Sequence, residues 1–160
     1  MSRERFHEAQ ANCSAGYDTA LAEIRRGHKT SHWIWYIFPQ LDGLGRSSTA
    51  RAYAIRDLAE ACAYLRDPFL HARYEEIAGA VSDQLALGVR LGALMGSRTD
   101  ALKLASSLTL FRAAARSLTS KDPIFESLAQ RCNSLLEQTA TQGYPPCAQT
   151  LAQVADRANR

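Results

Sequence analysis

Apolar residues recur every three or four positions along most of the chain, which is the spacing of one face of an α-helix. The first stretch keeps this pattern from Phe6 to Ile24. Gly16 interrupts it, so the sequence predicts either two short helices or one helix with a bend. Gly27 predicts the end of this region, because a glycine just past a helix adopts the left-handed conformation at little cost.

Capping signals divide the rest of the chain into further helices. An amphipathic stretch over residues 48–65 predicts one long helix. Asp67-Pro68 and Asp122-Pro123 each place an N-cap before a proline, which suits the first helical position. Other helical segments are predicted over residues 68–85, 91–95, 99–118 and 123–135, and in a small, weakly docked helix within 141–160. We therefore expect a single all-α domain of about seven helices over residues 1–160.

The most apolar run extends from Ser31 to Pro39 and contains both tryptophans. Ser31 is the expected N-cap, and Pro39 prevents a helix from continuing far beyond it. The run predicts a short buried helix, with a buried strand as the alternative.

Composition supports the helical interpretation, since Ala and Leu far outnumber Val and Ile. Nineteen basic and sixteen acidic residues leave a net charge of +3, which is too small to indicate nucleic acid or a membrane surface as the partner. The charged N-terminus leads into no apolar segment, and no apolar run reaches the length of a membrane span. The four cysteines form no C-x-x-C pair. We expect a cytoplasmic protein with free thiols, no metal and no cofactor.

Several polar groups could carry chemistry. His32 next to a helix N-terminus could act as a general base, and His28 four residues earlier is separated from it by a predicted turn, which argues against a shared metal. The loop containing Gly43, Gly45 and Ser47 has the outline of an anion-binding turn, although a plain helix connection uses the same residues. Lys103, Ser106 and Ser107 lie within one helical turn, where contact with an anion is favoured over a Ser–Lys nucleophile.

These polar groups lie in blocks that resemble a known family. The blocks are Phe6 to Gln10, Gly27 to Leu41, Gly43 to Ser47, Tyr53 to Ile55, Ala61 to Leu65, Asp100 to Lys103 and Ser106 to Phe111. Together they resemble the family called domain of unknown function 1810, over about residues 6–140. The resemblance implies a small all-α protein and no established activity. It also implies that the polar positions in these blocks matter: Gln10, His32, Gln40, Ser47, Lys103, Ser106, Ser107 and Thr109.

We expect these positions to form a pocket between the 31–47 block and the 100–111 helix, for a small anionic ligand that can carry an aromatic or nucleotide-like ring. The expected binding residues are Gln10, Trp33, Trp35, Gln40, Gly43, Gly45, Ser47, Lys103, Ser106 and Ser107, with His32 as base. The alternative is a protein interaction module that uses an exposed surface of Trp33, Trp35 and Tyr36. A third hypothesis, nucleic-acid binding through Arg25, Arg26, His28 and Lys29, is weaker because the basic cluster is short. The sequence does not indicate an oligomeric state or whether the chain is an enzyme.

Overall fold

The computed structural model describes residues 3–158, and side chains as far as residue 155. Within this range the chain is helical, with the elements α1 (Glu4–Gln10), α2 (Tyr17–Arg26), α3 (Ile34–Ile37), α4 (Ser48–Ala52), α5 (Leu58–Arg66), α6 (Pro68–Ala86), α7 (Leu91–Met95), α8 (Arg98–Thr119), η1 (Pro123–Phe125), α9 (Glu126–Thr141) and α10 (Ala148–Ala158). The all-α fold class is confirmed. The expected number of about seven helices is wrong, since the described residues form ten α-helices and one 3₁₀ turn.

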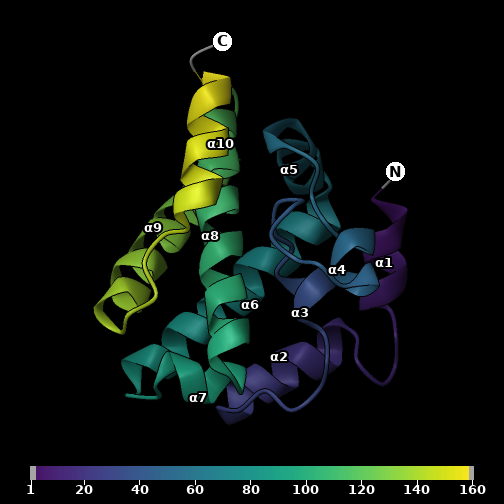
Figure 1. Ribbon diagram of the computed structural model, residues 1–160, viewed down its shortest axis with the longest axis vertical. Helices are drawn as coiled ribbons and strands as arrows, with labels where there is room; N and C mark the ends of the chain where they lie inside the picture. The colour runs from purple at the N-terminus through teal and green to yellow at the C-terminus, as the bar shows by residue number, and fades with distance from the viewer. Residues whose placement is uncertain (1–2, 159–160) are drawn as a thin grey trace.

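Helix α8 is the central element, and α3, α5, α7, α9, α10 and η1 all contact it. In Figure 1 it runs vertically, with α9 on one side, α10 overlapping its upper part, and α1, α3, α4 and α5 on the other side. Its length explains this role, because a helix of 22 residues extends about 33 Å, roughly the diameter of a small domain. Along it, Leu104, Leu108, Phe111 and Ala115 are fully buried, as the periodicity predicts.

An aromatic cluster joins the two sides of the molecule. The rings of Tyr74 and Phe111 have centroids 4.6 Å apart, and those of Tyr64 and Phe111 are 5.0 Å apart. Phe38 extends the cluster to α3, with its ring centroid 5.6 Å from that of Tyr74. The aromatic run is therefore a core element, and the predicted short helix is confirmed as α3.

The caps occur largely as the sequence predicts. Gly27 ends α2 with a φ of 89°, and the Asp67 carboxylate accepts hydrogen bonds from the first amides of α6. Asp122 caps in the same way, although the element that follows it directly is the short 3₁₀ turn η1. Ser31 is not the cap of α3: Trp33 occupies that position, and the Ser31 hydroxyl instead donates to Glu23.

The predicted long helix over residues 48–65 is wrong. It is two helices, α4 and α5, separated by residues 53–57. In this break Ile55 pairs with the segment after α3, donating its N–H to Gln40 and accepting from Asp42. Asp57 then begins α5, with its carboxylate accepting from the Glu60 amide. Backbone pairing with a distant segment thus overrides a helical pattern that continues through the break.

The terminal helix α10 is attached more firmly than its small, polar sequence indicates. Thr150 on its first turn is fully buried, and the Cys147 amide just before the helix donates to Thr109 of α8 at 3.0 Å.

The four cysteines are free thiols, as expected, and Cys62 and Cys132 are buried. Among the described residues, no helix combines the length and apolar character that a membrane span requires.

Candidate functional site

A buried carboxylate organises the segment between α2 and α3. Glu23 is 2% exposed, and it accepts hydrogen bonds from the amides of Thr30 and Ser31, from the Ser31 hydroxyl and from Trp33 Nε1. Burial alone would raise the pKa of this carboxyl, but the hydrogen bonds from Ser31, Thr30 and Trp33 outweigh it and lower the pKa to about 2. Trp33 is fully buried, so it belongs to this network and does not form a ligand-contacting wall.

Lys29 completes the network. Its ammonium lies 2.8 Å from the Asp100 carboxylate and 4.9 Å from the Trp33 ring centroid. Two other members of the basic cluster have partners: His28 contacts the Ala93 carbonyl, and Arg25 lies 3.9 Å from Glu76. These contacts tie α2 to its neighbours, and the buried Lys29 presents no charge to a nucleic acid.

Two more of the expected binding residues have structural partners in the core. Gln10 donates to the Tyr36 carbonyl and to Tyr64, and its carbonyl accepts from Arg73. Ser107 is fully buried and shares a hydrogen bond of 2.9 Å with Tyr74. Buried polar groups are normally paired in this way, which accounts for both residues without a ligand.

The expected anion-binding loop is a helix connection. Ser47 caps α4, accepting from the Ala50 amide, and Gly43 is exposed with a φ of 93°. Gly45 is required for packing, since a Cβ there would lie 2.5 Å from the Ala50 Cβ. His32 is exposed, because Trp33 next to it points into the core, and it does not line the cavities described below.

Three of the remaining predicted residues lie at a cavity of about 450 Å³ between the loop after α3, helix α8 and the loop before α10. Its walls are Gln40 and Leu44, then Thr99, Leu102, Lys103 and Ser106 of α8, and finally Pro145, Pro146, Cys147 and Ala148. This is the place where the sequence predicts a pocket, between the 31–47 block and the 100–111 helix. Gln40, Lys103 and Ser106 are the predicted residues that line it.

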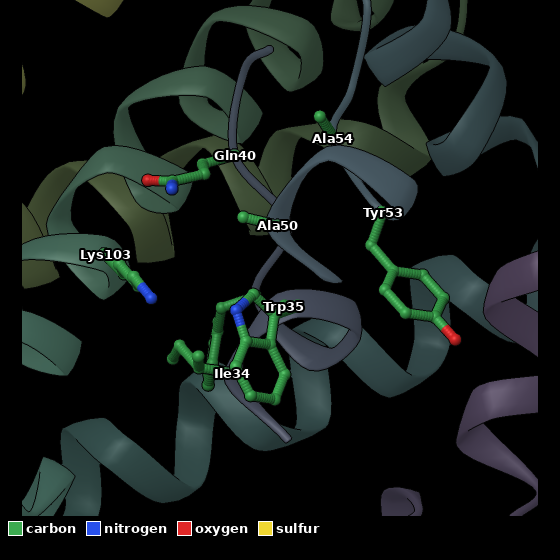
Figure 2. Close-up of a pocket in the computed structure, with 8 residues that line it drawn as sticks. Ile34, Trp35, Gln40, Ala50, Tyr53, Ala54 and Lys103 are labelled. Carbon is green, nitrogen blue, oxygen red and sulfur yellow. The ribbon is translucent and has the colours of Figure 1, made fainter. Parts of the chain in front are cut away.

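A smaller hollow of about 10 Å³ adjoins this cavity and shares Gln40 and Lys103 with it. Figure 2 shows the Lys103 side chain extending from α8 toward Trp35, and the Gln40 carboxamide pointing back toward α8. The Lys103 ammonium lies 5.6 Å from the Trp35 ring centroid. The indole nitrogen of Trp35 is buried and has no hydrogen-bond partner among the described residues, and the hollow has room for about one water molecule.

Lys103 differs from the other half-buried or buried cations near it. Lys29 on the same side of the molecule is paired with Asp100, whereas Lys103 has no carboxylate partner in the described part of the chain. Its ammonium instead lies over the Trp35 ring. An ammonium partly removed from water without a counter-ion is unfavourable, so this position favours an anionic ligand.

A second hollow of about 580 Å³ lies between α5, α8 and α10 and contains Arg112 and Arg116. Both guanidinium groups donate to the Asn133 side-chain oxygen, at 3.0 and 3.1 Å. The resemblance does not mark these arginines, and each already donates a hydrogen bond to the neutral Asn133 amide. This hollow is therefore the weaker of the two anion-binding candidates.

The sequence analysis missed Cys147, a half-buried residue on the wall of the larger cavity. The available signal was its position after Pro145-Pro146 and directly before a terminal helix, which places its side chain at a helix N-terminus. No group of three or more potential metal ligands occurs within the described residues.

The surface expected of an interaction module is mostly absent. Trp33 is fully buried and Tyr36 is 8% exposed, so only Trp35 presents part of its ring to solvent. One partly exposed ring offers much less than the contiguous aromatic patch on which that hypothesis depends.

The fold and this cavity are those of a small protein that is all-helical over residues 3–158. The chain belongs to the family described as protein of unknown function (DUF1810), whose model matches residues 1–142. It is similar to the conserved hypothetical protein Rv1873 from Mycobacterium tuberculosis, which has a crystal structure at 1.38 Å; the two are 35% identical over 95% of each chain, with a TM-score of 0.76. No curated protein matches the chain. The matched region includes Trp35, Gln40, Lys103 and Ser106, whereas Cys147 lies beyond the family model.

Proposed function

We propose that the chain binds a small anionic ligand in the cavity between the loop after α3, helix α8 and the loop before α10. The observation that carries the proposal is Lys103, a half-buried cation on the cavity wall without a carboxylate partner among the described residues. An anion in the cavity would supply the missing counter-charge.

The rest of the cavity suits such a ligand. Gln40 and Ser106 can donate hydrogen bonds to anionic oxygens. The Trp35 indole N–H, which lacks an acceptor among the described residues, lies in the small hollow that adjoins the cavity. Leu44 and Leu102 give part of the wall an apolar character, which accommodates a hydrocarbon or aromatic body. The ligand class is therefore a small carboxylate or phosphate, with an aromatic or nucleotide-like form as one variant.

Thermal unfolding with a panel of inorganic phosphate, citrate, benzoate and adenosine monophosphate tests this proposal. A ligand at one hundred times its Kd stabilises the folded state by about 2.7 kcal/mol, which gives a measurable rise in Tm. We expect at least one of these anions to raise the Tm of the wild-type protein, and the rise to disappear in Lys103→Met. Without ligand, Lys103→Met should be at least as stable as the wild type, because the substitution removes an unpaired charge and keeps the alkyl chain.

Two control variants show which hollow is responsible for the anion-dependent rise in Tm. Lys121→Met removes an exposed lysine just past the far end of α8 and should keep the full anion response. Arg116→Ala tests the second hollow. A response that survives in Lys103→Met, or that is lost only in Arg116→Ala, would contradict the proposal.

A further inference from the structure

Cys147 lies at the junction of three elements that surround the cavity. It immediately precedes α10, and its carbonyl accepts the first hydrogen bond of that helix from the Leu151 amide at 2.9 Å. Its own amide donates to Thr109 of α8. These two backbone bonds fix its position, while its half-buried side chain forms part of the cavity wall with Lys103 and Ser106.

The surroundings of this sulfur favour the thiolate. Burial acts to raise the pKa of the thiol, but hydrogen bonds from the Thr150 hydroxyl and amide, from Ser106 and from the Gln149 amide outweigh it and lower the pKa below its usual value. Cys132 is the opposite case, because burial among apolar groups raises its pKa to about 12. Cys147 is thus a nucleophile candidate, whereas Cys132 is inert packing.

Two observations independent of the cysteine point to a ligand at the same place. The cavity has a volume of about 450 Å³, which is enough for a small organic molecule. On its wall, Lys103 has no carboxylate partner in the described part of the chain. An anion that supplies this counter-charge would lie in the same cavity as the sulfur.

We propose that Cys147 is the nucleophile of this cavity and reacts covalently with small acids that carry an electrophilic carbon, held with their anionic group toward Lys103. In this step a sulfur electron pair forms a bond to the carbon, the bond from that carbon to its leaving group breaks, and the leaving group departs with the bonding pair. The step requires no oxidant or reductant. The orientation by Lys103 rests on the proposed anion-binding function, whereas the nucleophilicity of the sulfur does not.

Alkylation with a neutral and an anionic reagent separates these two properties. Iodoacetamide and iodoacetate form the same carbon–sulfur bond and both release iodide, but only iodoacetate carries a charge. Peptide mass spectrometry measures the rate at each cysteine, and the exposed Cys13 is the internal reference. We expect the iodoacetate-to-iodoacetamide rate ratio at Cys147 to exceed that at Cys13 by about threefold or more, since the ammonium of Lys103 on the same cavity wall attracts the anion.

Two variants identify which residues cause the iodoacetate preference and the reactivity of Cys147. In Lys103→Met the ratio at Cys147 should fall to that of Cys13, while the rate with iodoacetamide changes little. In Ser106→Ala the iodoacetate-to-iodoacetamide rate ratio at Cys147 should stay as in the wild type. The pH at which the iodoacetamide rate reaches half its maximum, its midpoint, should rise, because the thiolate loses one hydrogen-bond donor. In the wild-type protein this midpoint should lie below about 8.5, the value of an unperturbed cysteine.

The possible failures are distinguishable. A wild-type midpoint at or above that of an ordinary cysteine overturns the nucleophile proposal, even if Lys103 binds anions in the thermal experiment. A low midpoint with an iodoacetate preference equal to that of Cys13 overturns the orientation by Lys103. That second outcome, combined with no Lys103-dependent rise in Tm, contradicts the anion-binding function and leaves the reactive thiol established.

Discussion

Glu23 shows how one side chain can replace a helix cap. The six residues between Gly27 and α3 contain no helix or strand, and the Glu23 carboxylate accepts hydrogen bonds from two of their amides, those of Thr30 and Ser31. The same carboxylate holds the Trp33 indole, so the entry into α3 depends on a residue ten positions earlier. A buried carboxylate with several donors is strongly favoured in its ionised form.

We predict that Glu23→Gln destabilises the fold at neutral pH by about 1–3 kcal/mol, because an amide accepts fewer and weaker hydrogen bonds than a carboxylate. The folded-state pKa lies near 2, below the usual value of 4.5, so the stabilisation from ionised Glu23 is complete above pH 4.5. It is lost as the pH falls toward 2, because the unfolded chain takes up its proton first.

Urea unfolding between pH 7 and pH 2.5 measures this difference. The gap in unfolding free energy between the wild type and Glu23→Gln should narrow as the pH falls below 4.5. Glu8→Gln, an exposed residue of α1, is the matched control and should change stability by less than about 0.5 kcal/mol. A pH-independent gap would show that Glu23 acts through packing and not through its charge.

At the scale of elements, Gly16 controls the turn between α1 and α2. A Cβ at this position would lie 2.1 Å from the Asn12 carbonyl oxygen and 2.5 Å from that of Gln10. These are backbone atoms, so the turn itself would have to move. The sequence predicts a break at Gly16, and the structure adds the reason: the chain folds back against the end of α1.

We predict that Gly16→Ala lowers the unfolding free energy by about 3 kcal/mol, at the upper end of the cost of overpacking. Gly79→Ala is the matched comparison, because its Cβ would meet only the Arg131 guanidinium, at 3.9 Å, from inside α6. This second variant should stabilise the protein by about 0.5–1 kcal/mol through helix propensity. Denaturant unfolding measures the change in unfolding free energy for both variants, which should be opposite in sign. Equal changes would contradict the steric argument.

Helix boundaries could be predicted where the signal is local. Asp67 with Pro68 and Gly27 act through neighbouring residues, and the structure has both caps. The break at Ile55 could not be found in this way, because its cause is a backbone bridge to Leu41. Ser31 was misassigned for a related reason: its hydroxyl serves a carboxylate from another helix.

The candidate site residues also differ in whether a local signal reveals them. Lys103 and Gln40 could be predicted at one cavity, because one lies in a motif block and the other on a helix face that pack together. The sequence could not show that Gln10 and Ser107 are structural residues. A polar residue in a motif gives the same signal whether it binds a ligand or a core tyrosine. Cys147 could not be singled out from the sequence, because its low thiol pKa depends on hydrogen bonds from Ser106 of α8 and from the first residues of α10.

For the whole molecule, the arrangement around α8 predicts one cooperative unfolding transition. Tyr64, Tyr74 and Phe111 connect α5, α6 and α8 in one aromatic cluster, and a single group of buried residues extends from Phe6 to Tyr144. Calorimetry should therefore give equal calorimetric and van't Hoff enthalpies, with far-ultraviolet circular dichroism following the same transition. Two resolved transitions would show that the α1–α5 side folds independently of the α8–α10 side.

The two tryptophans differ in surroundings, and this difference provides the protein with an intrinsic optical probe. Trp33 is enclosed, with its indole fixed on Glu23, so its emission should be insensitive to small molecules in solution. Trp35 lies beside the Lys103 ammonium, and its buried N–H, which has no acceptor among the described residues, belongs to the small hollow that adjoins the cavity. A ligand that displaces this ammonium or accepts from the indole would change the emission of one fluorophore only. A Trp33→Phe variant would then report occupancy of the cavity directly, without any attached dye.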